Sequence, residues 1–346
     1  MITRLAFAGA FASAILLSVS AFSQWTWTPE TGRFINMGNL PKETAELQVE
    51  YTRSLVVAGD FSVAMTETEK FTQFYGDTEY ADDNQFLRGQ ILLEQDDYVK
   101  AAEEFQQLIS VYPESPLYDE VIESQYTIGD SLYEKGLKRA GSDDDEKGWQ
   151  PLKSLQKVNP FRHRPLKKAI DVYTMVINNQ PFTAAAAEAQ YKIGLCHFTR
   201  EEYLEASFEF RRVMEDYRDS DWVRESTFYL TRSYEEAALD PDYDQAPSKL
   251  AIGAIEDFSR RYPDDERVAQ RQEVSAEMNE RIAEQRYRTA RYYQKRRNMD
   301  SARIYYEITA HEFEGTAAAA KAAEWLAANP PSERAHPSFV GSPVGE

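Results

Sequence analysis

Few residues in this sequence are placed to make or break covalent bonds. The sole cysteine and a histidine are adjacent, as Cys196 and His197. Neighbours on a helix point about 100° apart, so these two do not readily form a nucleophile and its base. The other histidines, His163, His311 and His336, are scattered and lack the i,i+4 spacing of a zinc site. We therefore predict no catalytic residue, no metal site and no cofactor, and interpret Cys196 as a buried thiol.

Binding chemistry has better candidates, because an aromatic residue recurs along the chain with a small residue three places later. The recurring positions are Tyr51, Phe86, Tyr126, Tyr191, Phe228 and Tyr287. Such a row could line a groove that grips an apolar segment of a partner. It could equally pack helix against helix, which is the commoner use of a repeated apolar position. Tyr51, Phe86 and Tyr126 are our aromatic candidates for a client-binding groove.

Two arginines extend this candidate groove. Arg53 and Arg88 each follow an aromatic residue by two places, where later repeats have Ile128, Ile193 and Leu230. A charge at this position could reach a carboxylate or a backbone carbonyl of a client. Alternatively, each arginine lays its stem on the protein and holds its head in water.

A second candidate surface lies near the end of the chain, where basic residues cluster. The candidates for docking a partner are Tyr287, Arg291, Lys295, Arg296 and Arg297. Such a run could bind an acidic partner, although it more often decorates a solvated helix face. A further charged stretch, acidic and then basic, begins at "SDDDE". It could meet a partner or anionic headgroups, or be a solvated loop.

These residues must be positioned by helices, because an alanine-anchored pattern repeats six times. Each alanine is followed eleven residues later by a position that ends the pattern, usually a tyrosine before a turn such as "YPES" or "YPDD". Larger apolar residues recur four and seven places after the alanine, which is one face of a helix. The alanines are Ala64, Ala101, Ala169, Ala206, Ala251 and Ala302.

The aromatic and small residues mark a first helix before each alanine-anchored helix, so the unit is a helix pair. Tandem helix pairs of this length stack into a solenoid. We predict an all-α, tetratricopeptide-like solenoid of about six helix pairs with a C-terminal capping helix. The predicted divisions are a signal peptide at 1–23, an extended lead segment at 24–42, the solenoid at 43–329 with an insert at about 138–165, and a disordered tail at 330–346.

The ends and the charge of the chain indicate its compartment. Leu5 to Val19 is apolar and follows Arg4, and small residues precede Gln24, which is the pattern of a cleaved signal peptide. The chain has 58 acidic and 39 basic residues, which argues against nucleic acid as a partner. No cysteine follows the signal, so we expect no lipid anchor there.

The chain resembles the BamD-type subunit of the outer-membrane β-barrel assembly machinery. The resemblance lies in the order of the units, in the "YPES" and "YPDD" turns and in the last unit, "RIAEQRYRTARYYQKRRNMDSARIYYEITAHEF". The resemblance implies a periplasmic scaffold associated with the outer membrane. Its first repeats would receive an extended segment of an unfolded outer-membrane protein, and its later repeats would dock onto a barrel-bearing partner. The family is normally lipid-anchored, so here we expect membrane association through the partner. The alternative is a soluble periplasmic tetratricopeptide adaptor for cell-wall or division factors, and neither function is enzymatic.

Overall fold

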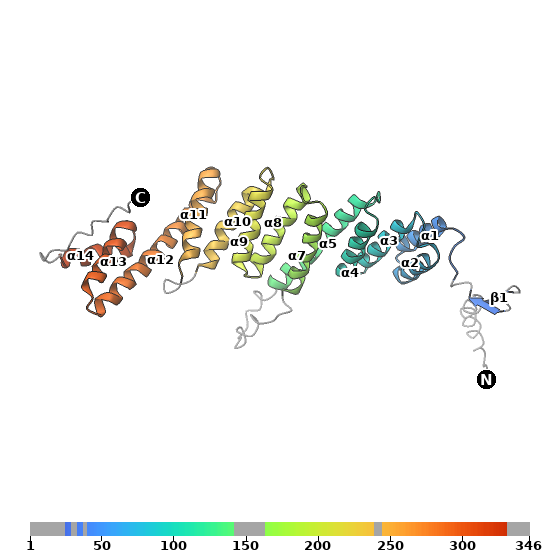
Figure 1. Ribbon diagram of the computed structural model, residues 1–346, viewed down its shortest axis with the longest axis horizontal. Helices are drawn as coiled ribbons and strands as arrows, with labels where there is room; N and C mark the ends of the chain where they lie inside the picture. Colours follow the sequence, from blue (N-terminus) through green and yellow to red (C-terminus); the bar gives the residue numbers. More distant parts are fainter. Residues whose placement is uncertain (1–24, 29–32, 37–39, 142–162, 239–243, 331–346) are drawn as a thin grey trace, which may run out of the picture. The chain divides into compact units, whose positions relative to one another are not determined.

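A computed structural model describes residues 25–28, 33–36, 40–141, 163–238 and 244–330. Helices make up almost all of this part of the chain (Figure 1). They are α1 (Ala45–Ala58), α2 (Phe61–Tyr75), α3 (Ala81–Glu94), α4 (Tyr98–Val111), α5 (Tyr118–Gly141), α7 (Arg164–Asn179), α8 (Ala184–Thr199), α9 (Tyr203–Asp216), α10 (Trp222–Ala237), α11 (Ala246–Arg261), α12 (Val268–Lys295), α13 (Met299–Glu312) and α14 (Ala317–Ala328). The chain divides within α5 into two compact units, Met1–Ile128 and Gly129–Glu346.

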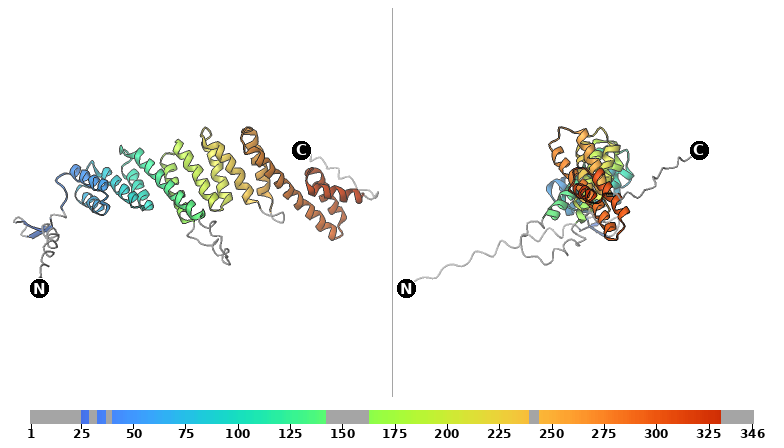
Figure 2. Two further views of the ribbon diagram at one scale, coloured as in Figure 1. Left: turned by 180° about the vertical axis from the view of Figure 1, so that it is seen from behind. Right: turned by 90° about the vertical axis from the view of Figure 1, so that its left-hand side faces the viewer.

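Successive helices form pairs, which confirms the predicted solenoid. The pairs are α1–α2, α3–α4, α5–α7, α8–α9, α10–α11 and α12–α13, with α14 following the last. Helices α7 to α10 of the second unit lie side by side from the front and from behind (Figures 1 and 2). All six alanines predicted to anchor the second helices are fully buried. In five pairs the predicted closing residue follows the last residue of its second helix, and in the first pair Tyr75 is that last residue.

The small residues of the first helices allow the paired helices to approach closely. A β-carbon on Gly89 would lie 2.4 Å from the ring of Phe105, and one on Gly129 would lie 2.6 Å from the ring of Tyr173. Both rings stand four residues after an anchoring alanine. The ring on the second helix therefore occupies the space that the missing side chain leaves on the first.

A polar contact that is at least partly buried joins the helices of three pairs. A glutamine sixteen residues before the anchoring alanine donates to a glutamate three residues after it. In the first pair, Gln48 Nε2 lies 2.7 Å from Glu67 Oε2, and in the second, Gln85 Nε2 lies 2.6 Å from Glu104 Oε2. Gln190 and Glu209 make the same contact between α8 and α9. These hydrogen bonds satisfy polar groups that would otherwise be costly to bury.

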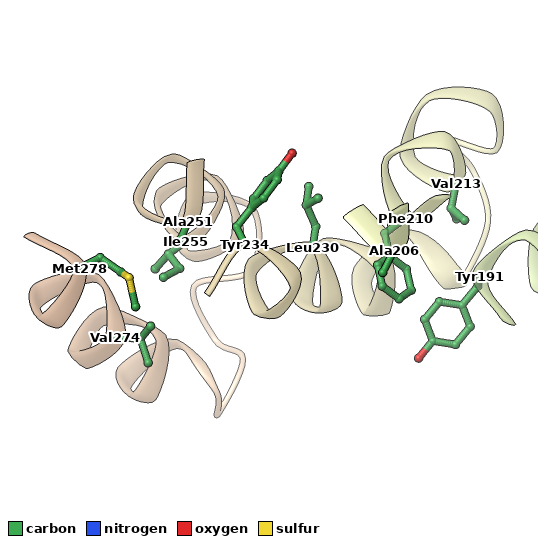
Figure 3. Packing of buried hydrophobic residues seen from close by; sticks show 10 residues of the cluster. All are labelled: Tyr191, Ala206, Phe210, Val213, Leu230, Tyr234, Ala251, Ile255, Val274 and Met278. Atoms are coloured by element: carbon green, nitrogen blue, oxygen red, sulfur yellow. The ribbon is translucent and has the colours of Figure 1, made fainter. Parts of the chain in front are cut away.

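The core of the second unit runs through consecutive pairs. Figure 3 shows ten buried side chains contributed by α8 to α12, with the Tyr191 and Phe210 rings beside one another. A separate cluster surrounds Tyr306, whose ring stacks on Trp325 of α14 with centroids 4.2 Å apart. Glu280 of α12 also accepts hydrogen bonds from the first backbone amides of α14. Helix α14 thus closes the last pair, as a capping helix should.

The lead segment contains a feature that we did not predict. Two strands, β1 (Trp25–Thr28) and β2 (Arg33–Asn36), pair antiparallel with Trp25 opposite Asn36. The expected signal peptide, the central part of the insert and the expected tail lie outside the described residues. No helix in the described part is long and apolar enough to cross a membrane.

Candidate protein-binding site

The first unit carries a hollow of about 490 Å³ on its first helices. Helices α1, α3 and α5 each contribute side chains at helical spacing, so the hollow crosses three successive units of the repeat. Its lining residues are Arg53, Val56, Val57, Asp83, Phe86, Gln90, Leu93, Glu94, Leu117, Glu120 and Ser124. A surface that crosses adjacent repeats in this way suits an extended or helical peptide.

Apolar side chains line part of the hollow and are exposed to water. Val57 is 86% exposed although it is large and apolar. Val56, Leu93 and Leu117 line the same space, and the edge of the otherwise buried Phe86 reaches it. Covering these groups with a partner would remove apolar area from water, which is the main favourable term in most associations.

The charged lining consists of one arginine and three carboxylates. Arg53 Nη2 donates to Asp83 Oδ1 at 3.0 Å, and the arginine side chain is 57% exposed. Burial raises the pKa of Asp83, the neighbouring Asp82 adds to that effect, and Arg53 opposes it. An ion pair this exposed contributes at most about 1 kcal/mol, so Arg53 can exchange Asp83 for a group on a client. Glu94 and Glu120 complete an acidic lining that favours clients without acidic residues.

Arg88 does not line this hollow. Its guanidinium donates to both carboxylate oxygens of Glu104 on α4, at 3.0 and 2.9 Å. Burial alone would raise the pKa of Glu104, but the hydrogen bond and charge of Arg88 outweigh it, and the pKa lies below its usual value. Arg88 therefore joins the two helices of its own pair.

The assignment of Arg53 and Arg88 to the same position of the repeat is wrong. Arg53 lies eleven residues before Ala64, whereas Arg88 lies thirteen before Ala101. The residue eleven before Ala101 is Gln90, and both Arg53 and Gln90 line the hollow. The two arginines look equivalent in the sequence because each follows an aromatic residue by two places. However, the residue of α1 that is equivalent to Phe86 of α3 is buried Val49, two places before Tyr51, so the first unit was misaligned by two residues. Counting back from the alanine would have found the equivalent residues.

The aromatic row packs mainly inside the pairs. The rings of Phe86, Tyr191 and Tyr287 contact the rings of Phe105, Phe210 and Tyr306, with centroids 5.5 to 5.8 Å apart. Tyr51 is partly exposed, and the Lys42 ammonium lies 3.7 Å from the centre of its ring. Tyr126 is partly buried on α5. Of the five predicted groove residues, the hollow brings together Arg53 and Phe86.

The predicted docking residues lie at the end of α12. Tyr287 packs against Tyr306 and is partly buried, so it supports the last pair. Arg291, Lys295, Arg296 and Arg297 are exposed, and none of them forms an ion pair with a described residue. Exposed Tyr292 stands beside them, under the Arg296 guanidinium at 4.7 Å, and exposed Met299 begins the next helix. The surface is thus both basic and apolar.

The adjacent cysteine and histidine do not form a reactive pair. Cys196 is fully buried in α8, and burial raises the pKa of its thiol. His197 Nδ1 lies 2.8 Å from the carboxylate of Glu202, the residue before α9. The part of the chain described here holds no group of three or more side chains placed to bind a metal ion.

Several hollow-lining residues were missed in the sequence, although the signal was available. Val57 lies one helical turn after Arg53, and Gln90 and Leu93 lie one and two turns after Phe86. Glu120 and Ser124 of α5 and Leu117, just before that helix, follow the same spacing. Projecting the pattern along each first helix would have predicted most of this lining.

Comparison with known families agrees with this architecture. A family model described as outer membrane lipoprotein, YfiO, matches residues 153–329, and a tetratricopeptide-repeat model matches residues 83–115. No match was found among curated proteins.

Similar solved structures include other tetratricopeptide-repeat proteins. The C-terminal part of one from Cytophaga hutchinsonii is 14% identical, over 81% of this chain and 88% of that one, with a TM-score of 0.35. One from Parabacteroides merdae is 13% identical, over 82% and 97%, with a TM-score of 0.32.

The YfiO match spans just over half of the chain, from before α7 to the end of α14. That region contains the exposed basic end of α12 and the capping helix. The chain therefore belongs to the YfiO outer membrane lipoprotein family, the BamD-type tetratricopeptide-repeat proteins that its sequence resembles.

Proposed function

We propose that this protein is a periplasmic scaffold of the outer-membrane β-barrel assembly machinery. It binds extended segments of unfolded outer-membrane proteins in the first unit and a barrel-bearing partner at the end of α12. Its work is non-enzymatic and consists of binding and positioning other chains. Membership of the YfiO family and the tetratricopeptide repeat support a protein-binding role at the outer membrane.

The observation that carries the client-binding part is the hollow over α1, α3 and α5. It combines exposed Val57 with apolar Val56, Leu93 and Leu117, and it offers the exposed guanidinium of Arg53. An unfolded outer-membrane protein presents alternating apolar side chains along an extended backbone. Apolar side chains would occupy the hollow, while Arg53 donates to a backbone carbonyl of the client.

The barrel-bearing partner would dock on the basic end of α12. Arg291, Lys295, Arg296 and Arg297 offer charges that no described carboxylate neutralises, and Tyr292 and Met299 add apolar area. An acidic patch on the partner would complement this surface. Cys196 is buried in α8 and is not a lipid attachment point, so we expect this docking to hold the protein at the membrane.

Site-specific photocrosslinking tests the client-binding part. A crosslinking amino acid at Val57 should capture outer-membrane protein segments in intact envelopes, whereas one at Val63, an exposed valine on α2 that does not line the hollow, should not. The Val57→Asp variant should bind such segments about tenfold more weakly, because a carboxylate replaces apolar contact area. Val63→Asp is the matched control. Equal crosslinking from both positions would contradict a groove on the first helices.

Co-purification tests the partner. From solubilised envelopes, the protein should elute with a β-barrel component, and reversing the charges of Arg291 and Lys295 to glutamate should separate them. Recovery of the wild-type protein without any barrel partner would instead favour the soluble adaptor.

A further inference from the structure

A second hollow lies on the second unit and shares no residue with the surfaces described above. It has a volume of about 440 Å³. Its lining comes from α9, the turn after it, the start of α10 and the last turn of α11. The residues are Arg211, Met214, Glu215, Arg218, Val223 and Arg261. Three arginines thus face one glutamate, in a chain whose net charge is −19.

Among the described residues, no ion pair is formed by the three arginines of this hollow, and two of them donate to neutral groups. Arg211 donates to the hydroxyl of Tyr234, and Arg218 Nε donates to the backbone oxygen of Glu215 at 3.1 Å. Neither contact neutralises a charge. In contrast, Arg260, beside Arg261 on α11, forms an ion pair with Asp257. The chain therefore pairs the arginine next to the hollow and leaves those that line it available.

Apolar side chains extend from the hollow along α9. Three residues of α9 are spaced by four and then three positions, which places them on one face of the helix: Leu204, Phe208 and Arg211. Leu204 is 47% exposed and Phe208 is 59% exposed. The Arg211 guanidinium lies 6.0 Å from the centre of the Phe208 ring, which continues the surface into the hollow. Met214 and Val223 supply apolar lining inside it.

We propose that this surface binds an acidic, amphipathic segment of a partner protein. Carboxylates of that segment would take the forked donors of Arg211, Arg218 and Arg261, since a guanidinium matches a carboxylate with two parallel hydrogen bonds. Apolar residues of the same segment would cover Phe208 and Leu204. The apolar lining of Met214 and Val223 favours such a mixed segment over a phosphate group, which would leave these side chains uncovered.

The surface is independent of the client hollow and of the basic end of α12. Its residues belong to α9, the turn after it, α10 and α11, whereas those sites lie on the first unit and at the end of α12. A partner could occupy it while the other two surfaces are in use. Failure of either proposed role would leave this binding site untouched.

The test is fluorescence anisotropy with the full chain and a labelled peptide of nine residues that alternates glutamate and leucine. A second peptide has glutamine in place of every glutamate. The glutamate peptide should bind about tenfold more tightly than the glutamine peptide, and its affinity should fall as salt is added. Inorganic phosphate and vesicles containing phosphatidylglycerol are the competing probes, and neither should displace the peptide at concentrations near its Kd.

Two double variants that change the net charge equally distinguish binding in the hollow from the long-range electrostatic attraction of the whole protein. Arg218→Gln with Arg261→Gln should weaken binding of the glutamate peptide by about tenfold. Arg212→Gln with Arg260→Gln removes exposed arginines of α9 and α11 that are paired with Glu209 and Asp257, and should change affinity less than about twofold. All four arginines have exposed side chains, so both variants should keep the helix content of the wild type.

Three results would overturn the proposal. One is an equal loss of affinity in the two double variants, because the effect would then be general electrostatics. Another is equal binding of the two peptides, because carboxylates would then not be recognised. The third is binding of phosphatidylglycerol vesicles that depends on Arg218 and Arg261 in the absence of peptide binding, because the ligand would then be a lipid surface.

Discussion

Gly194 of α8 faces the ring of Phe210 in α9 so closely that a β-carbon on residue 194 would lie 2.6 Å from that ring. Real β-carbons essentially never come so close to another heavy atom. Phe210 is fully buried and belongs to the core cluster of the second unit, so its ring has no open space to enter (Figure 3). The glycine therefore sets the distance between the two helices of this pair.

Gly194→Ala should destabilise the protein by about 1–3 kcal/mol, the usual cost of an added methyl group in a packed core. The free energy of unfolding is measured in urea, with circular dichroism monitoring the loss of helix. Gly253→Ala on α11 is the control, because a β-carbon there would meet nothing within 4 Å. It should stabilise by about 0.5–1 kcal/mol, since alanine is the better helix former. Stabilisation by both substitutions would contradict close packing at Gly194.

The turn between the helices of a pair gives a second prediction. Five residues before the anchoring alanine, the backbone has a positive φ in four pairs, at Gly59, Asp96, Glu201 and Arg297. This conformation costs a residue with a side chain roughly 1 kcal/mol, and glycine adopts it freely. Glu201→Gly should therefore raise the free energy of unfolding by about 0.5 kcal/mol, after the entropy that glycine adds to the unfolded chain is subtracted.

The reverse substitution is the control for that turn. A β-carbon on Gly59 would meet no atom within 4 Å, so Gly59→Ala tests the backbone alone. It should lower the free energy of unfolding by about 1 kcal/mol. A lower free energy of unfolding for Glu201→Gly would contradict the prediction. It would mean that contacts of the Glu201 side chain stabilise the fold by more than the positive φ destabilises it.

The repeat explains how much of the fold could be predicted. The anchoring alanines are fully buried at positions where only a small side chain fits, so their spacing alone indicated about six helix pairs. The family resemblance agreed with the YfiO match. The hairpin formed by β1 and β2 was not predicted, since its "WTWTPETGRFIN" segment lies before the repeat and shares none of its spacing.

The candidate groove was harder to predict because its residues are constrained less tightly. A helix turns by about 100° per residue, so an alignment error of two residues moves a side chain to a different face. That error placed Arg88 in the groove, whereas it binds Glu104 within its own pair. Glu104 lies sixteen residues from Arg88 in the sequence, so this pairing became evident only when the two helices were placed side by side.

A buried carboxylate at the turn before α12 gives a third prediction. Asp265 is 1% exposed in its side chain and receives hydrogen bonds from the backbone and guanidinium of Arg267 and from the guanidinium of Arg224. The hydrogen bonds of Arg267 outweigh the effect of burial and hold the pKa of Asp265 far below its usual value. Asp265→Asn should destabilise by about 3 kcal/mol at pH 7, because two arginines lose a buried charge partner.

The pH dependence of that loss has a definite sign. Since the folded pKa of Asp265 lies below the unfolded value of about 3.9, the carboxylate stabilises the fold above pH 5 and loses this effect as the pH falls toward 2. The difference in unfolding free energy between wild type and Asp265→Asn should therefore shrink over that interval. Asp264→Asn, at an exposed neighbouring position, is the control and should show little difference at any pH. A constant difference for Asp265→Asn would mean that its charge does not provide the stabilisation.

The last prediction concerns the sole cysteine. Cys196 is fully buried in α8, and burial raises the pKa of its thiol, so the native protein at pH 8 holds almost no accessible thiolate. Labelling by a thiol reagent should therefore be undetectable in the native state and complete in denaturant. In intermediate urea its rate should follow the unfolding of the second unit. A Cys196→Ser protein with Ser110→Cys, at an exposed position on α4, should label at once without urea. Rapid labelling of native Cys196 would instead show that α8 opens locally. Gly194 lies two residues before Cys196, so its close contact with Phe210 would then also be broken part of the time.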